Sequence, residues 1–478
     1  MARGYGYFAK NIGLLTVSNF GSKFLGFLLV PLYTNVLTTE QYGTYDILYT
    51  SVSLLIPLLT INLNEGVMRF CLDKNQSKDE VLSVAAKVLV LGYFLLGLLL
   101  VLNHAFGVIP LLDEFAVPFA LLYVVNATNG ILVMYARGVD RIADVAVSGI
   151  LCSAFMLGFS VLLLVVFPLG LTGYFASNIV GPAVQAFYIV VKGRLWRELS
   201  LGRPTNGEGN LFKRMTSYTT PMIANSVSWW VSNAAGKYAV IFICGAAMNG
   251  IYSASYKIPS ILSMFQSIVY SAWVLSAVQD FDPDDKNGFF SNTYNAYGFA
   301  MSVLCSIMII VDRPLAGFLY GSDFCDAWIY VPPLLISIVF LSLASFLGGV
   351  FSAVKDSRAY AKSSMVAALC NVILSFLLVW RCGIMGAAIA VVTSYLVMLV
   401  LRLRDARKYI KLRVRLARDF CSYAVLTIQA ALLVLLPLDS ALLYLPQVVC
   451  LAALLALYRR ELLWFARAFS RKFFGCCA

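Results

Sequence analysis

Four lysines lie inside long apolar stretches of the 478-residue sequence: Lys23, Lys87, Lys237 and Lys257. A charged side chain near the centre of a bilayer costs about 2.5–3.5 kcal/mol on insertion scales, so such residues usually face an aqueous cavity or a partner of opposite charge. Ammonium groups can hold a phosphate by charge-assisted hydrogen bonds. Lys23, Lys237 and Lys257 therefore predict an anion-binding site at membrane depth. Lys87 lies near a helix end, where a lysine can simply snorkel to the interface, and the other three are open to the same explanation.

Aromatic and amide side chains gather around two of these lysines. Asn19 precedes Lys23 by four residues, and around Lys237 lie Asn225, Trp229, Trp230, Asn233 and Tyr238. Ligand sites combine apolar walls with a few well-placed hydrogen-bonding groups. This set suits a ligand with hydroxyls and apolar ring faces, such as a sugar. The two tryptophans would suit a lipid-facing surface equally well.

Acidic residues are scarce in the apolar stretches, and Asp46 stands nearly alone there. It is expected either to pair with Lys23 or to couple or gate transport. Glu65 and Arg69 are spaced as an i,i+4 pair at the end of the second apolar stretch. Such a pair stabilises a helix, so its role is structural or one of gating.

Long helices must position these residues. The chain is 60% hydrophobic and 13% charged, with a mean hydropathy of +0.82. No soluble protein of this size could cover a core with so little polar surface, so the composition predicts an all-α polytopic membrane protein. A span needs about 20 apolar residues, which predicts about 14 transmembrane helices. They are expected at 12–33, 45–63, 81–103, 115–136, 145–167, 172–191, 216–245, 251–278, 289–311, 327–354, 360–380, 383–401, 420–436 and 441–458.

The basic residues orient these spans. Of the 36 lysines and arginines, four lie within the apolar stretches and 30 fall on one side, and Arg313 and Arg381 are the exceptions. The positive-inside rule then places both termini in the cytoplasm. The net charge of +12 faces anionic lipid, so a nucleic acid partner is not expected. The basic tail 459–478 repeats aromatic and leucine residues at helical spacing, which predicts an amphipathic interfacial helix.

The two halves of the chain resemble each other. Ser18-Asn19 with Lys23 recurs as Ser232-Asn233 with Lys237, and Gly170 with Gly173 recurs as Gly383 with Gly386. Parallel repeats of this kind place a substrate site at the interface of two lobes, which predicts a central cavity. The expected division is an N-lobe of six spans, a cytoplasmic linker, a C-lobe of six spans, a basic cytoplasmic loop, two added spans and the tail. Their residues are 1–192, 193–215, 216–402, 403–418, 419–458 and 459–478.

Catalytic and cofactor chemistry find little support. The 11 cysteines are scattered singly apart from Cys476-Cys477, and His104 is the one histidine, so neither a metal site nor a disulfide framework is indicated. No nucleotide motif is present, and no cofactor is expected. A membrane polymerase, ligase or acyltransferase would need more acid/base residues outside the membrane than Asp312, Asp323 and Asp326. A cation-coupled drug antiporter remains an alternative, although it usually needs a buried acidic cluster.

The opening of the chain resembles a known family. The run from Asn11 through Ser18-Asn19-Phe20-Gly21-Ser22-Lys23 to Glu40-Gln41-Tyr42-Gly43-Thr44-Tyr45-Asp46 is similar to the start of Wzx-type polysaccharide biosynthesis flippases. Glu65-Gly66-Val67-Met68-Arg69-Phe70 resembles the end of their second helix, and Gly383-Ile384-Met385-Gly386 their late glycine motif. This family belongs to the MOP exporter superfamily, together with lipid II flippases and MATE exporters.

The resemblance implies a function. It implies a two-lobed fold that moves undecaprenyl-pyrophosphate-linked oligosaccharide across the bacterial inner membrane by alternating access, for O-antigen, capsule or exopolysaccharide assembly. The implied partners are this lipid-linked substrate, membrane lipid and other membrane proteins of polysaccharide assembly. Lipid II flippases are similar in carrying cationic residues on their first and eighth helices, where this chain has Lys23 and Lys257. Lysine lacks the bidentate grip of arginine on phosphate.

Overall fold

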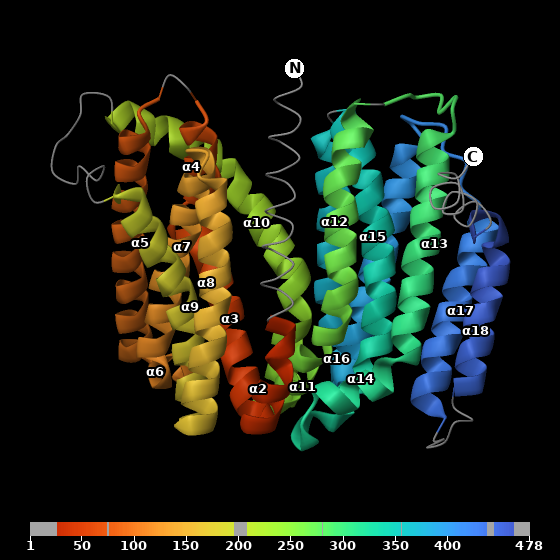
Figure 1. Cartoon of the computed structure of the whole chain (residues 1–478), viewed down its shortest axis with the longest axis horizontal. Coiled ribbons are helices and arrows are strands. Elements are labelled where there is room, and N and C mark those ends of the chain that lie inside the picture. Colours follow the sequence, from red (N-terminus) through yellow and green to blue (C-terminus); the bar gives the residue numbers. More distant parts are fainter. Residues whose placement is uncertain are drawn as a thin grey trace, which may run out of the picture. The chain divides into compact units, whose positions relative to one another are not determined.

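The computed structural model describes residues 26–73, 76–195, 208–279, 281–354, 356–436 and 444–462, and within these ranges the regular structure is helical (Figure 1). Among these residues, nine helices are long and apolar enough to cross a membrane, or ten if the bent pair α3 and α4 forms one span. The protein is therefore an all-helical, multi-pass membrane protein. The total of fourteen spans stays a prediction, since part of the first expected span is not described and α18 is short.

The chain forms two compact units, which divide between Ala234 and Ala235, inside the long helix α10 (Glu208–Cys244). Unit 1 contains α2 (Val30–Val36), α3 (Thr39–Leu59), α4 (Leu63–Cys71), α5 (Lys78–Phe106), α6 (Pro110–Glu114), α7 (Ala116–Gly138), α8 (Ile142–Val161), the π-helical turn η1 (Leu162–Val166), α9 (Gly170–Gly193) and the first part of α10. The predicted boundaries of lobes and linker stay predictions.

Unit 2 contains the rest of α10 and the helices that follow it. They are α11 (Ala246–Ser255), α12 (Lys257–Gln279), α13 (Phe289–Ile310), α14 (Asp312–Leu319), the 3₁₀ segment η3 (Ser322–Tyr330), α15 (Val331–Ala353), α16 (Ser357–Ala406), α17 (Leu416–Leu435) and α18 (Tyr444–Leu457).

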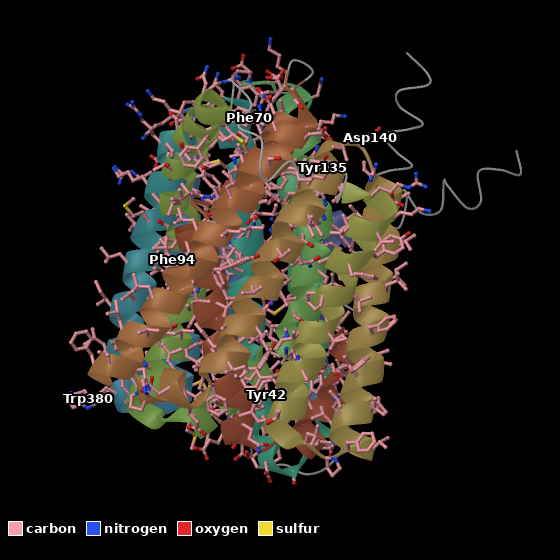
Figure 2. All side chains as sticks on the ribbon, turned by 90° about the vertical axis from the view of Figure 1, so that its left-hand side faces the viewer. Tyr42, Phe70, Phe94, Tyr135, Asp140 and Trp380 are labelled. Atoms are coloured by element: carbon pink, nitrogen blue, oxygen red, sulfur yellow. The ribbon has the colours of Figure 1, made fainter. Side chains whose placement is uncertain are left out.

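In unit 1, the second expected span is broken. α3 begins with a capping box, in which the Thr38 hydroxyl accepts from the Gln41 N–H and the Gln41 side chain accepts from the Thr38 N–H. It ends before Ile61 and Asn62, which both adopt left-handed backbone angles, and α4 continues at 55° to it. Figure 2 shows Phe70, near the end of α4, and Asp140 at one end of this unit and Tyr42 at the other.

In unit 2, α15 is the central helix. In the span Ser322–Ala353, 89% of the most apolar part is buried, whereas the corresponding share in the span Ile142–Val166 of unit 1 is 17%. Neighbouring helices therefore shield α15 from lipid. Trp273 of α12 donates from its indole to the Phe346 carbonyl at 2.8 Å and stacks on the Phe346 ring. Gly349 makes this approach possible, because a Cβ there would lie 2.6 Å from the indole nitrogen.

The two expected spans 360–380 and 383–401 form one kinked element, α16. The break is at Gly383, whose angles (φ 57°, ψ −140°) are not helical. Only glycine adopts such angles without strain.

The predicted basic loop 403–418 is shorter in the structure, where α16 ends at Ala406 and α17 begins at Leu416. Arg402 and Arg418, which the sequence assigns to cytoplasmic connections, are helical and largely buried. Arg402 donates to the Ala344 carbonyl and to the hydroxyls of Ser363 and Ser364. These partners come from α15 and from the start of α16, so sequence spacing could not reveal them.

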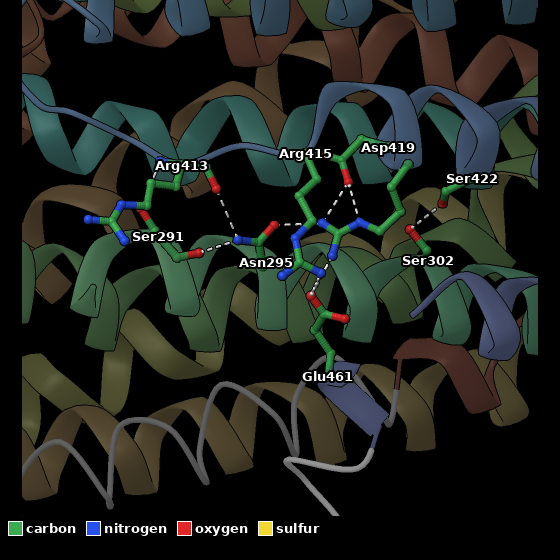
Figure 3. A network of polar contacts seen from close by, with 9 residues as sticks. Ser291, Asn295, Ser302, Arg413, Arg415, Asp419, Ser422 and Glu461 are labelled. Atoms are coloured by element: carbon green, nitrogen blue, oxygen red, sulfur yellow. Dashed lines mark hydrogen bonds and ion pairs between the residues drawn. The ribbon is translucent and has the colours of Figure 1, made fainter. Parts of the chain in front are cut away.

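Arg418 is the centre of a polar network near the start of α17 (Figure 3). Its guanidinium donates to Asp419, to Glu461 beyond α18, and to the Asn295 side chain on α13. Asn295 also donates to the Arg413 carbonyl at 3.4 Å. The network therefore fastens α13, α17 and the segment after α18 to one another.

Candidate functional site

One side of α10 carries polar and aromatic residues at a spacing of four: Asn225, Trp229, Asn233 and Lys237. Residues four apart lie on one face of a helix. The first three are exposed, Trp229 to 71%, and Lys237 is half-buried. We call this set the α10 stripe. Backbone and side-chain polar groups exposed to lipid are costly, so this face is expected to meet water or a polar ligand.

The two tryptophans of α10 differ in their surroundings. Trp230 donates from its indole N–H to the Thr50 carbonyl of α3 at 2.8 Å, which fastens α10 to α3 within unit 1. Trp229 is exposed, and its backbone carbonyl accepts from the Asn233 side chain at 2.7 Å. The ring of Tyr238 lies 6.1 Å from that of Phe242. Trp229 is therefore better placed than Trp230 to meet a ligand, a difference that the sequence pattern does not contain.

In unit 2, Lys237 lies on α10 and Lys257 on α12, and α11, which connects these helices, packs against α10. Gly236, next to Lys237, approaches Tyr252 of α11 so closely that a Cβ would lie 2.7 Å from the tyrosine oxygen. The hydroxyls of Tyr252 and Tyr256 are 2.9 Å apart, and Lys257 follows Tyr256 as the first residue of α12. Both lysines are half-buried.

A compact apolar cluster supports this pair of lysines. It consists of buried residues of α10, α11, α15 and α16: Ala239, Val240, Tyr252, Leu334, Val379, Ile384, Ala387 and Ala388. The late glycine motif contributes Ile384 and the adjacent alanines to it. The glycine motif therefore acts in packing, in a cluster that α10 and α11 share with it.

In unit 1, Asp46 lies half-buried on α3 beside a tyrosine cluster, in which the rings of Tyr45 and Tyr33 lie 4.3 and 4.5 Å from that of Tyr174. Its expected partner Lys23 lies outside the described residues, as does Asn19, so the pairing stays a prediction.

Glu65 and Arg69 are both exposed on α4, and no ion pair joins them in the described structure. The i,i+4 spacing alone does not produce an ion pair here, because two exposed charges gain little free energy from pairing in water. α4 itself is held against α10 at Gly66, where a Cβ would lie 2.7 Å from the Thr219 methyl. A role for Glu65 and Arg69 in gating stays a prediction.

The described residues also line a pocket of about 470 Å³ that contains none of the predicted site residues. It lies in unit 2 and is lined by Tyr270, Phe351, Ser352, Asp356, Ser357 and Tyr360. The Tyr409 hydroxyl donates to Asp356 at 2.6 Å, and this hydrogen bond lowers the pKa of the Asp356 carboxyl. Asp356 also caps α16 by accepting from the Ala359 N–H. No group of three or more potential metal ligands occurs among the described residues.

The fold is similar to those of several solved membrane proteins. It is similar to a solved structure entitled lipid II flippase MurJ, inward closed conformation, with a TM-score of 0.65, 13% identity, and coverage of 96% of this chain and 99% of that one. It is also similar to an inward-facing multidrug resistance MATE family transporter of the MOP superfamily, with a TM-score of 0.63, 11% identity, and coverage of 81% and 94%. For an outward-facing MATE transporter the TM-score is 0.53, at 14% identity and coverage of 83% and 92%.

The sequence also matches a protein-family model. The model described as polysaccharide biosynthesis protein matches residues 8–274, more than half of the chain. The protein belongs to the polysaccharide biosynthesis protein family. A search of curated protein sequences found no match.

Proposed function

We propose that the protein is a flippase that moves undecaprenyl-pyrophosphate-linked oligosaccharide from the cytoplasmic to the periplasmic leaflet of the bacterial inner membrane. The observation that carries the proposal is the placement of Lys237 and Lys257 in a chain of the polysaccharide biosynthesis family. These two half-buried cations lie next to the residues by which α10 packs against α11 and by which α11 leads into α12. A diphosphate crossing a low-dielectric slab needs such cations along its path.

The α10 stripe could bind the sugar part of this substrate. Sugars present hydroxyls and apolar ring faces, and the stripe offers two amides and an exposed indole in line with Lys237. This combination of amides, an indole and a lysine suits a sugar linked to a diphosphate better than a drug. The fold is similar both to a lipid II flippase and to drug transporters, so it is compatible with either function. In the proposed cycle, Lys23, Lys237 and Lys257 hold the diphosphate. Asn19, Asn233, Trp229, Trp230 and Tyr238 contact the glycan, Trp230 through its ring, because its indole N–H donates to the Thr50 carbonyl. The two predicted lobes alternate access, with Asp46, Glu65 and Arg69 in gating.

The proposal includes the topology expected from the sequence, with fourteen spans and both termini in the cytoplasm. The substrate would pass between the two lobes that the internal repeat predicts. The assembly proteins that consume the oligosaccharide on the far side are the expected partners.

Export assays with lysine variants test the proposal. In cells lacking the chromosomal gene, Lys257→Ala should abolish export of the polysaccharide and leave lipid-linked oligosaccharide on the inner leaflet, with protein level unchanged. Lys257→Arg should restore export in part, because the charge is kept while its shape changes. Lys411→Ala is the matched control, since Lys411 is an exposed lysine of the same unit that pairs with Asp284. Full export by Lys257→Gln together with Lys237→Gln would overturn the proposal.

A further inference from the structure

Asp312, the first residue of α14, is fully buried. Neither of its carboxylate oxygens accepts a hydrogen bond from any described residue, and no described lysine or arginine lies within ion-pair distance of it. Buried polar groups are almost always satisfied, so an orphaned one calls for an explanation. A buried, unpaired carboxylate normally avoids its charge by taking up a proton.

The surroundings of Asp312 favour this neutral form. α13 brings no charged side chain to α14, and its titratable groups are Tyr294, Tyr297 and Cys305. η3 brings Asp323, Cys325, Asp326 and Tyr330, and both aspartates are exposed. The charge that acts on the carboxyl is that of Arg313, whose guanidinium lies over the Trp328 ring at 4.4 Å from its centroid. Burial outweighs Arg313 and raises the pKa of Asp312 well above its usual range.

A hydrogen bond connects this residue's helix to the proposed substrate site. Tyr320, at the end of α14, donates from its hydroxyl to the Ala254 carbonyl of α11 at 3.1 Å. Ala254 lies three residues before Lys257. α14 and η3 also form a cap at the end of unit 2 that is opposite the connection from α12 to α13 (Figure 1). The positive-inside rule places that end outside, where a proton from the periplasm can enter.

We propose that Asp312 is a proton-binding site that is linked, through the cap formed by α14 and η3, to substrate binding at Lys257. A proton from the outer solution adds to a carboxylate oxygen. The neutral carboxyl allows α14 and η3 to pack with Asp312 buried, as in this structure. Loss of that proton leaves a buried charge, which drives the cap to open and disturbs α11 through Tyr320. The link to substrate rests on the proposed function, whereas the proton site does not.

Infrared titration of the full-length protein in lipid nanodiscs tests the site directly. The wild-type protein should show the carbonyl band of a protonated carboxyl at neutral pH, and Asp312→Asn should lose it. Asp323→Asn, which alters an exposed aspartate of the adjacent segment, is the control and should keep the band. Asp312→Glu should retain a band at a shifted frequency, which guards against loss of the fold in the Asn variant. A wild-type band that Asp312→Asn leaves in place would overturn the proposal.

The link is tested by the affinity for undecaprenyl pyrophosphate as a function of pH. Because coupling between sites is typically 5-fold or more, the wild-type Kd should change by at least about 5-fold between roughly pH 6 and pH 8, and Asp312→Asn should flatten this dependence. A wild-type Kd that is independent of pH, or one that depends on sodium at fixed pH, would overturn the link. Absence of binding at every pH would instead refute the flippase proposal, and the infrared titration would still decide the proton site.

Discussion

Replacing Arg418 by methionine should destabilise unit 2 severely, because the guanidinium satisfies two buried acids at once. The side chains of Arg418, Asp419 and Glu461 are exposed by only 9%, 8% and 11%. Arg418 also lies over the Tyr458 ring, 4.3 Å from its centroid. Removing one member of a buried ion pair costs about 3–5 kcal/mol, since the partner is left as an uncompensated buried charge. Arg418→Met leaves Asp419 without its partner guanidinium, whereas Glu461 keeps an ion pair with Arg415 at 3.6 Å, so we expect a loss within this range.

The measurement is the free energy of unfolding of the purified protein in mixed detergent micelles. Lys408→Met is the control, because Lys408 forms an ion pair with Asp405 at 2.6 Å but its side chain is 64% exposed. Exposed pairs contribute about 0–1 kcal/mol, and the control should lose no more than that. A triple variant with Arg418→Met, Asp419→Asn and Glu461→Gln should recover most of the loss, because it leaves no buried charge in the network. Equal losses for Arg418→Met and Lys408→Met would refute the assignment of this network as the anchor of α13, α17 and the segment after α18.

Two further predictions concern other contacts. Gly236→Leu should lower the free energy of unfolding by about 1–3 kcal/mol, because overpacking against the Tyr252 hydroxyl forces α10 and α11 apart. The same variant should bind diphosphate more weakly, as measured by calorimetry. Unchanged stability and affinity would contradict the close contact. Tyr409→Phe should raise the pKa of Asp356 towards its usual value, as measured by carboxyl NMR titration. The lowered pKa contributes stability above the ordinary aspartate pKa, and this is lost as the pH falls through the lowered value, so the Phe variant should show less acid sensitivity of its melting temperature over that window. A melting temperature with the same acid dependence as the wild type would contradict this reasoning.

The helices themselves could be predicted from the sequence, because a membrane span requires a long apolar run and little else. The expected spans 81–103 and 289–311 correspond to α5 (Lys78–Phe106) and α13 (Phe289–Ile310) within a few residues. The break between α3 and α4 was not predictable, since Ile61 and Asn62 adopt left-handed angles with no glycine at the bend. The burial of Arg402 depends on Ala344, which lies 58 residues away along the chain. Such partners are set by packing, and packing has no local signature.

Exposure separates the cations of unit 2 into two kinds, and this bears on which of them can meet a substrate. Arg402 and Arg418 are almost fully buried, and their donors are committed to carbonyl, hydroxyl, amide and carboxylate oxygens of their own unit. A ligand could reach them only by breaking those bonds. Lys237 and Lys257 are only half-buried, and lysine can reorient its three donors around a flexible stem. Under the proposed function the cargo must be released on the far side, and half-buried lysines would release a diphosphate more readily than an arginine whose donors are already bonded to its own unit.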